Sequence, residues 1–80
     1  MTVQEARENY CIAVTYFLSA TAKYGAAYNA ADIAASTDRL TEARTLLYEA
    51  YGDDDKAYYA SIEIAASAAT ILRHHRLTRN

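Results

Sequence analysis

Alanine is the feature of this sequence that most narrows its fold. Eighteen of the 80 residues are Ala, Pro is absent, and the only glycines are Gly25 and Gly52. Alanine has the highest intrinsic helix propensity, whereas Gly and Pro are the residues that interrupt helices. The chain is therefore predicted to be all-α, with helices that end near its two glycines.

The size of the chain predicts a single domain. Eighty residues cannot supply two independent cores, since each core needs roughly 50 residues at least. The larger apolar residues, Val, Ile, Leu, Phe and Met, number only 15. A deep apolar cavity is not expected in so small a core, and no cofactor is predicted.

A repeat of seven residues predicts helices over residues 3–24, 26–51 and 54–77. In the first two helices a large residue recurs every seven positions, and a small residue follows it by three. The large residues are Val3, Tyr10, Phe17, Tyr24, Ile33, Leu40 and Leu47, and the small ones are Ala6, Ala13, Ala20, Ser36, Ala43 and Ala50. Small residues in such a seam let helix axes approach to about 8 Å. We expect a three-helix up-down-up bundle with closely packed antiparallel helices.

Local signals support these helix ends. Thr2 and Glu5 have the spacing of a capping box, and Gly25 and Gly52 are placed as left-handed caps at helix C-termini. The run Ser36-Thr37-Asp38 leaves open whether the second helix is continuous, because these side chains compete for backbone hydrogen bonds.

The third helix has several apolar positions that could face the core. The predicted stripe is Tyr58, Ile62, Ala65, Ala69 and Leu72, widened by Ile64, Ala68 and Ile71. Residues spaced by three and four lie on one side of a helix. We therefore expect the side of the third helix that carries Tyr58 and Ile62 to pack against the other two helices.

The charge of the chain is small but unevenly distributed. The net charge is −2, too small to require a nucleic acid or a membrane as partner. Residues 1–72 carry ten acidic and five basic side chains, whereas residues 73–80 carry three Arg, two His and no acid. The sequence therefore predicts an acidic body with a short basic C-terminal segment.

Cysteine content and the longest apolar run bear on location. Cys11 is the only cysteine and cannot form a disulfide within the chain, so we expect a reducing compartment, the cytoplasm. The apolar run from Tyr10 to Ala20 has 11 residues, fewer than the roughly 20 that a membrane-spanning helix needs. No membrane partner is predicted.

The sequence motifs of common enzymes and metal sites are missing. The two glycines stand alone, so the chain has no glycine-rich phosphate loop. His74 and His75 are neighbours that point about 100° apart on a helix, so they cannot share a metal ion. Cys11 lies in an apolar run, where a thiol is a poor nucleophile. We predict no enzyme activity, no catalytic residue and no metal site.

The middle of the first helix is apolar on nearly all sides. Cys11, Ile12 and Leu18 lie off its seam, and a helix that is apolar all round is expected to be covered all round. Small chains often gain missing core by associating. We therefore expect a homodimer whose interface contains these three residues.

The strongest candidate for a binding surface surrounds the second turn, where tyrosines and acids alternate. Its members are Tyr48, Glu49, Tyr51, Asp53, Asp54, Asp55, Tyr58 and Tyr59. Tyrosines provide rigid amphipathic contact area, and the acids add negative potential. This composition predicts contact with a protein partner that has a basic surface. The alternative for the same residues is structural, with tyrosines that fill the end of the core and acids that cap the third helix.

Two other functions remain open. Arg73, Arg76 and Arg79 recur every three residues and could contact phosphates, which would make the chain a weak nucleic-acid binder. The chain could also be a structural subunit of an assembly. The favoured prediction is a non-enzymatic regulator or inhibitor that occludes a partner surface, of the kind carried by phages and mobile elements.

Overall fold

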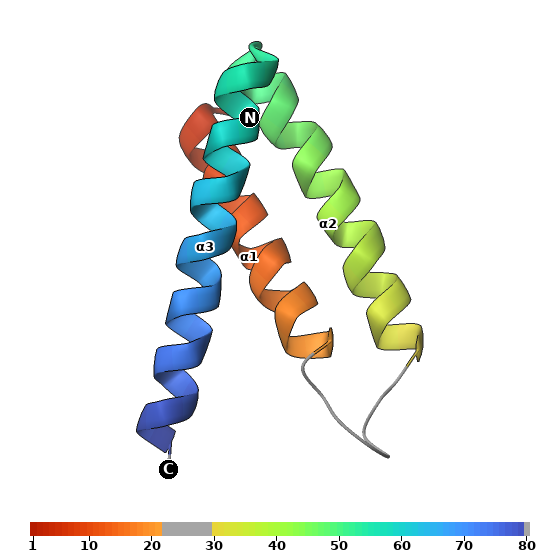
Figure 1. The fold of residues 1–80 in the computed structure, drawn as a ribbon. Helices are drawn as coiled ribbons and strands as arrows, with labels where there is room; N and C mark the ends of the chain where they lie inside the picture. Colours follow the sequence, from red (N-terminus) through yellow and green to blue (C-terminus); the bar gives the residue numbers. More distant parts are fainter. Residues whose placement is uncertain (22–29, 80) are drawn as a thin grey trace.

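Three helices make up nearly all of the part of the chain that the structure describes. The structure is a computed structural model, and it describes residues 1–21 and 30–79, with side chains up to residue 74. The helices are α1 (Val3–Thr21), α2 (Ala30–Tyr51) and α3 (Asp54–Arg79), and the described residues include no strand. All three pack against one another (Figure 1). The predicted all-α three-helix bundle is confirmed.

The helices run down, up and down in chain order. α2 and α3 meet at the turn next to the N-terminal end of α1, and their axes diverge toward the other end (Figure 1). The predicted helix ends at residues 24–26 lie outside the described residues, and α3 continues to Arg79, two residues beyond the predicted end.

Two predicted helix caps are present, one at the start of α1 and the other at the end of α2. The Thr2 amide donates to Oε1 of Glu5 over 3.0 Å, and the Glu5 amide donates to Oγ1 of Thr2 over 3.1 Å, which confirms the capping box. At the end of α2, Gly52 has φ 67°, and its amide donates to the Tyr48 carbonyl over 3.0 Å. This left-handed cap stops α2 and turns the chain toward α3.

The run Ser36-Thr37-Asp38, which left the continuity of the second helix open, does not interrupt α2. Oγ of Ser36 and Oγ1 of Thr37 both donate to the Ile33 carbonyl, over 2.9 and 2.7 Å. The hydroxyls bond to the preceding turn of the same helix instead of capping a new one. Ser36 is fully buried in the seam, where its small side chain does not leave a polar atom without a partner.

The core is thin and consists mainly of small residues. Buried residues that touch one another are Ala6, Tyr10, Ala13, Val14, Ala43, Leu47, Ile64 and Ala68. The largest side chain with almost no exposed surface is Leu47. The predicted seam is therefore confirmed at Tyr10 in α1 and Leu47 in α2, whereas Val3 at the start of α1 is exposed.

The main stripe predicted for α3 is displaced from the buried side by about one residue, or 100° around the helix, whereas Ile64 and Ala68, predicted to widen that stripe, are buried. Among the residues of α3 whose side chains are described, 54–74, the buried ones are Ala57, Ala60, Ser61, Ile64 and Ala68. Tyr58 and Ile62, predicted to face the core, are 49% and 50% exposed. The chosen face is richer in Ala and Ser, and small residues allow α3 to lie closer to its neighbours than Tyr58 and Ile62 would. A second apolar stripe is left on the outside of α3.

Candidate interaction surface

The predicted tyrosine and acid cluster occupies the turn between α2 and α3 and the helix ends beside it. The structure divides its eight residues into two groups. Tyr48 and Tyr51 on α2 are partly buried, whereas the other six, Glu49, Asp53, Asp54, Asp55, Tyr58 and Tyr59, are exposed. We call these six residues the acidic tyrosine surface.

Tyr51 joins α2 to α1. Nη1 of Arg7 donates to the Tyr51 hydroxyl over 2.8 Å, and Nη2 of Arg7 lies 3.5 Å from Oε1 of Glu63 on α3. The hydrogen bond to Tyr51 is the main reason that the pKa of Arg7 is raised. Arg7 therefore links all three helices near the turn, and Tyr51 serves the fold.

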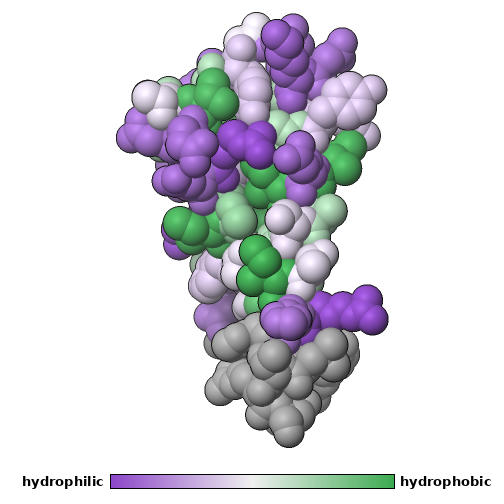
Figure 2. Space-filling view, turned by 90° about the vertical axis from the view of Figure 1, so that its left-hand side faces the viewer, coloured by the Kyte–Doolittle hydropathy of each residue, from purple (hydrophilic) through white to green (hydrophobic). Residues whose placement is uncertain are grey.

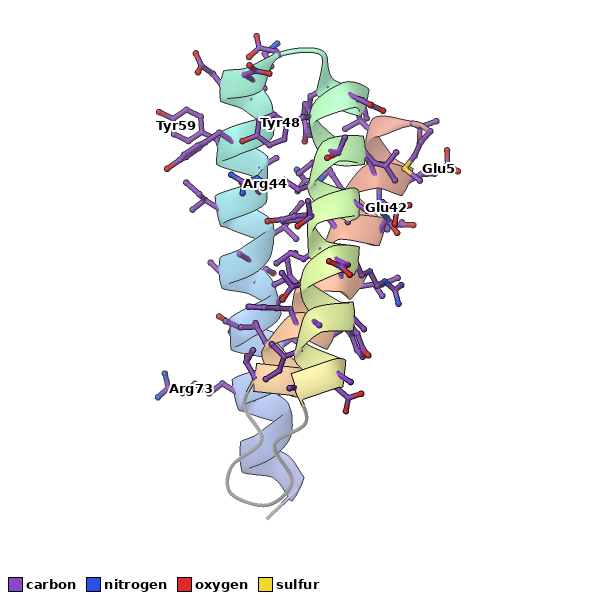
Figure 3. The ribbon with its side chains drawn as sticks, turned by 90° about the vertical axis from the view of Figure 1, so that its right-hand side faces the viewer. Glu5, Glu42, Arg44, Tyr48, Tyr59 and Arg73 are labelled. Atoms are coloured by element: carbon purple, nitrogen blue, oxygen red, sulfur yellow. The ribbon has the colours of Figure 1, made fainter. Side chains whose placement is uncertain are left out.

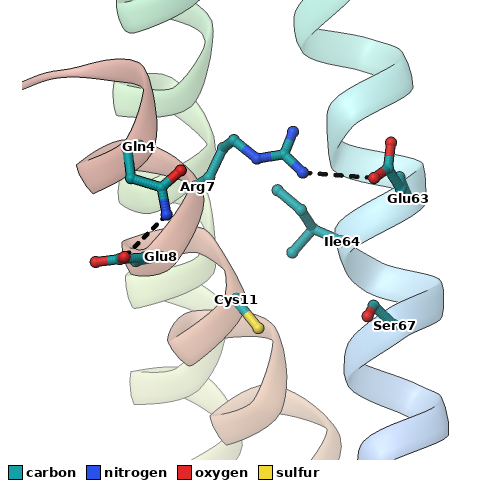
Figure 4. A pocket seen from close by; sticks show the side chains of 7 residues that line it. All are labelled: Gln4, Arg7, Glu8, Cys11, Glu63, Ile64 and Ser67. Atoms are coloured by element: carbon teal, nitrogen blue, oxygen red, sulfur yellow. Dashed lines mark hydrogen bonds and ion pairs between the residues drawn. The ribbon is translucent and has the colours of Figure 1, made fainter.

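The link at Arg7 borders a shallow pocket of about 230 Å³ between α1 and α3 (Figure 4). Its lining residues are Gln4, Arg7, Glu8, Cys11, Glu63, Ile64 and Ser67. Nε2 of Gln4 donates to Oε1 of Glu8 over 2.9 Å at its edge. The two polar side chains at the edge already bond to each other, and Arg7 and Glu63 are paired, so the pocket offers few unsatisfied groups to a ligand.

Tyr48 lies beside Arg44 on α2. The Arg44 guanidinium is 5.8 Å from the centre of the Tyr48 ring, within the range of a cation–π contact (Figure 3). Both side chains act on the buried Tyr10 of α1, where burial raises the pKa and the Arg44 charge opposes that rise. Tyr48 is partly buried and adds to the rise in the pKa of Tyr10, so it is less available to a partner than Tyr58 and Tyr59 are.

Tyr58 and Tyr59 form the aromatic part of the acidic tyrosine surface. Their ring centres are 5.9 Å apart, and the ring planes are tilted by 37°. Tyr59 is 73% exposed and points away from the other helices (Figure 3). An exposed aromatic pair of this size is a typical anchor for a protein partner.

The three aspartates begin α3 directly before this pair. Oδ1 of Asp53 accepts the Lys56 amide over 3.0 Å, so Asp53 is the N-cap of α3. Asp54 and Asp55 are exposed in the first turn, where they also suit the positive end of the helix dipole. The acids therefore have a structural role, and Asp54 and Asp55 also present negative charge to solvent.

The three residues of α1 that were predicted to form a dimer interface are not all on the surface. Cys11 and Leu18 pack against the core of their own chain, whereas Ile12 is 55% exposed. Ile12 and the exposed Tyr16 line a groove of about 410 Å³ that reaches Arg39 of α2. Arg39 lies 6.0 Å from the centre of the Tyr16 ring. Tyr16 was not predicted as part of an interface, although its position four residues after Ile12 places both on one side of α1.

The basic segment is described only in part. Arg73 is exposed on α3, whereas the side chains of Arg76 and Arg79 lie outside the described residues. Within the described part of the chain, no three His, Cys, Asp or Glu residues cluster in a way that could hold a metal ion. The described helices also include none that is long and apolar enough to cross a membrane.

Comparison with known protein families, curated proteins and solved structures found no match to this chain.

Proposed function

We propose that this chain is a non-enzymatic protein that binds a partner protein through the acidic tyrosine surface. The observation that carries the proposal is the exposed pair Tyr58 and Tyr59 next to Asp54 and Asp55. Exposed aromatic side chains are costly to leave in water, and they are enriched at the centres of protein interfaces. Four neighbouring carboxylates, those of Glu49 and Asp53–Asp55, favour a partner with a basic surface.

The fold supports recognition by a rigid surface. The left-handed cap at Gly52 and the N-cap at Asp53 fix the turn, and the Arg7 link to Tyr51 and Glu63 fixes the helices on either side of it. A preformed surface loses little conformational entropy when it binds. We infer a regulator or inhibitor that covers a partner surface, of the kind that phages and mobile elements carry, acting in the cytoplasm, where the lone Cys11 stays reduced.

The test is a binding measurement with a matched pair of tyrosine variants. Wild-type protein is immobilised, proteins retained from an extract of its own cell are identified, and the retained protein is purified and titrated. Tyr59→Ala should weaken that binding by about tenfold or more, whereas Tyr16→Ala, which removes an exposed tyrosine of α1, should leave it unchanged. Raised salt should also weaken the binding of the wild-type protein, because salt screens the attraction between the acids and a basic partner.

Two results would contradict the proposal. One is a purified partner that binds Tyr59→Ala as tightly as it binds the wild type. The other is the absence of any retained protein whose binding depends on Tyr59 or on the neighbouring aspartates.

Nucleic-acid binding through the C-terminal part of α3 is the second candidate, because Arg73 is exposed there. Few phosphate contacts would make such binding weak and dependent on salt. A gel-shift titration at low salt distinguishes the two functions. Retention of DNA or RNA that is lost in Arg73→Ala and kept in Tyr59→Ala would favour this candidate over the first.

A further inference from the structure

The outer side of α3 carries a stripe of exposed residues that the three-helix core does not use. Tyr59 and Ile62, both at least half exposed, lie in its N-terminal half, and the exposed Ala66 and Ala69 lie in its C-terminal half. Spacings of three and four residues place them on one side of the helix. Large apolar residues therefore occupy one half of the stripe and small ones the other.

Opposite charges mark the two ends of this stripe. Asp55 precedes Tyr59, and Arg73 follows Ala69, both exposed and on the same side of α3. Tyr59 and Arg73 project to the same side of the helix, away from α1 and α2 (Figure 3). On the side of the molecule where α3 lies, hydrophilic residues stand at the top and near the lower end of the described part, with apolar residues between them (Figure 2). We call this stripe, Asp55, Tyr59, Ile62, Ala66, Ala69 and Arg73, the outer face of α3.

We propose that the outer face of α3 binds the same face of a second copy of this chain, with the two helices antiparallel. The two residues of each facing pair lie equally far from residue 64 in the sequence, one before it and the other after it. The two-fold axis of the dimer therefore passes beside residue 64. Ile62 then lies opposite Ala66 of the second copy, Tyr59 opposite Ala69, and Asp55 opposite Arg73. Each interaction occurs twice, as in any isologous dimer.

Shape supports this register. Each large side chain faces an alanine, so the helices can approach closely without a clash. A parallel arrangement would place Tyr59 against Tyr59 and leave a gap between the alanines. The pattern of large and small residues therefore fits the antiparallel pair.

Charge supports the same register. Asp55 and Arg73 are 18 residues apart, or about 27 Å along one helix, so they cannot pair within a chain. Neither forms an ion pair with another described residue. The antiparallel pair brings them together at both ends of the interface, whereas a parallel pair would place like charges together. A contact between two helices is at the small end of protein interfaces, and we expect micromolar association.

Self-association affects the proposed function because Asp55 and Tyr59 belong to both surfaces. In the dimer these residues are covered, so a basic partner competes with the second copy. This regulatory consequence rests on the proposed function, whereas the dimer itself does not. Arg73 is outside the acidic tyrosine surface, which allows the two to be tested separately.

The experiment measures molecular mass by sedimentation equilibrium at micromolar to millimolar concentrations, using two charge-reversal variants. Asp55→Arg and Arg73→Glu each place like charges together at both ends of the dimer, and each should weaken self-association by about tenfold or more. An equimolar mixture of the two variants restores an opposite-charge pair at each end. The mixture should therefore form a heterodimer with affinity close to that of the wild-type dimer. Circular dichroism checks that each variant retains its helices.

The competing interface on α1 supplies the control. Ile12→Glu places a charge on the exposed side of α1, outside the outer face of α3, and should leave self-association unchanged. The proposal is overturned if the wild type is a monomer at millimolar concentration, if the mixed variants do not associate, or if Ile12→Glu abolishes the dimer while Arg73→Glu keeps it.

Failure of this inference can be told apart from failure of the proposed function. Arg73→Glu should lose self-association and keep or increase binding of the purified partner, because it leaves the acidic tyrosine surface uncovered. Tyr59→Ala should lose both. A monomeric wild type that still binds its partner through Tyr59 would overturn the dimer alone.

Discussion

Two isoleucines of α3, separated by one residue, should respond very differently to replacement by alanine. Ile64 is 6% exposed and contacts the core cluster, whereas Ile62 is 50% exposed on the outer face. Ile→Ala removes three carbons, which for a buried side chain costs about 2.5 kcal/mol of transfer free energy, and the cavity left behind adds to this. We expect Ile64→Ala to lower the free energy of unfolding by about 3 kcal/mol.

Ile62→Ala should lower the free energy of unfolding by only about 0.5 kcal/mol, because half of the side chain is already in water and Ala is the better helix former. Urea unfolding followed by far-ultraviolet circular dichroism measures both values, at a protein concentration low enough to keep the chain monomeric. Equal losses, or a larger loss at Ile62, would refute the orientation of α3 that the account requires.

Three further outcomes concern the helix caps and a buried tyrosine. A Cβ at Gly52 would meet no other atom, so Gly52→Ala should cost about 1 kcal/mol from the positive φ alone, and Gly52→Asn less, as measured by thermal unfolding. Hydrogen bonds from Thr2 hold the pKa of Glu5 below its ordinary value of 4.5, so the stability that Glu5 adds is present above that value and is lost as the pH falls through the lowered pKa. The difference in melting temperature between wild type and Glu5→Gln should therefore shrink in acid. Burial raises the pKa of Tyr10, so the stability of the wild type should fall as the pH rises past 10.0. The fall should be less steep in Tyr10→Phe. Phenolate absorbance should show that Tyr10 ionises at a higher pH than an ordinary tyrosine.

The sequence was sufficient to predict the helices because their signals are local. The high Ala content, the capping box at Thr2 and the glycine at residue 52 act within a few residues of themselves. The seam of α2 was also predictable, because Leu47 and Ala43 follow the same seven-residue spacing as the earlier positions. Ser36 was harder, since a serine that bonds to its own helix and one that caps a new helix look alike in sequence.

The buried side of α3 could not be chosen from the sequence. Two stripes with helical spacing run along it, one containing Ile62 and the other Ile64, and periodicity alone favours neither. The choice depends on contacts with the other helices, including the ion pair between Arg7 and Glu63. This ion pair joins residues that are 56 positions apart, so no local sequence pattern indicates it.

The candidate surface was predictable as a region but not residue by residue. Tyr51 follows Leu47 by four positions, which places it near the core side of α2, and this signal could have separated it from the exposed tyrosines. Its bond to Arg7 spans 44 positions and could not have been foreseen. Tyr58 and Tyr59 are exposed because α3 buries its small side, so their availability for a partner follows from the packing of the whole bundle.

The most direct test of the account measures the exposure of isoleucine methyl groups in the native chain by NMR, using a soluble paramagnetic agent. In dilute protein, the methyl signal of Ile64 should broaden least, and those of Ile12, Ile62 and Ile71 should broaden strongly. As the concentration rises, Ile62 should become protected while Ile12 stays exposed. Strong broadening of Ile64, or protection that develops at Ile12 while Ile62 stays exposed, would contradict the claim that α3 has one side in the core and the other open to a partner.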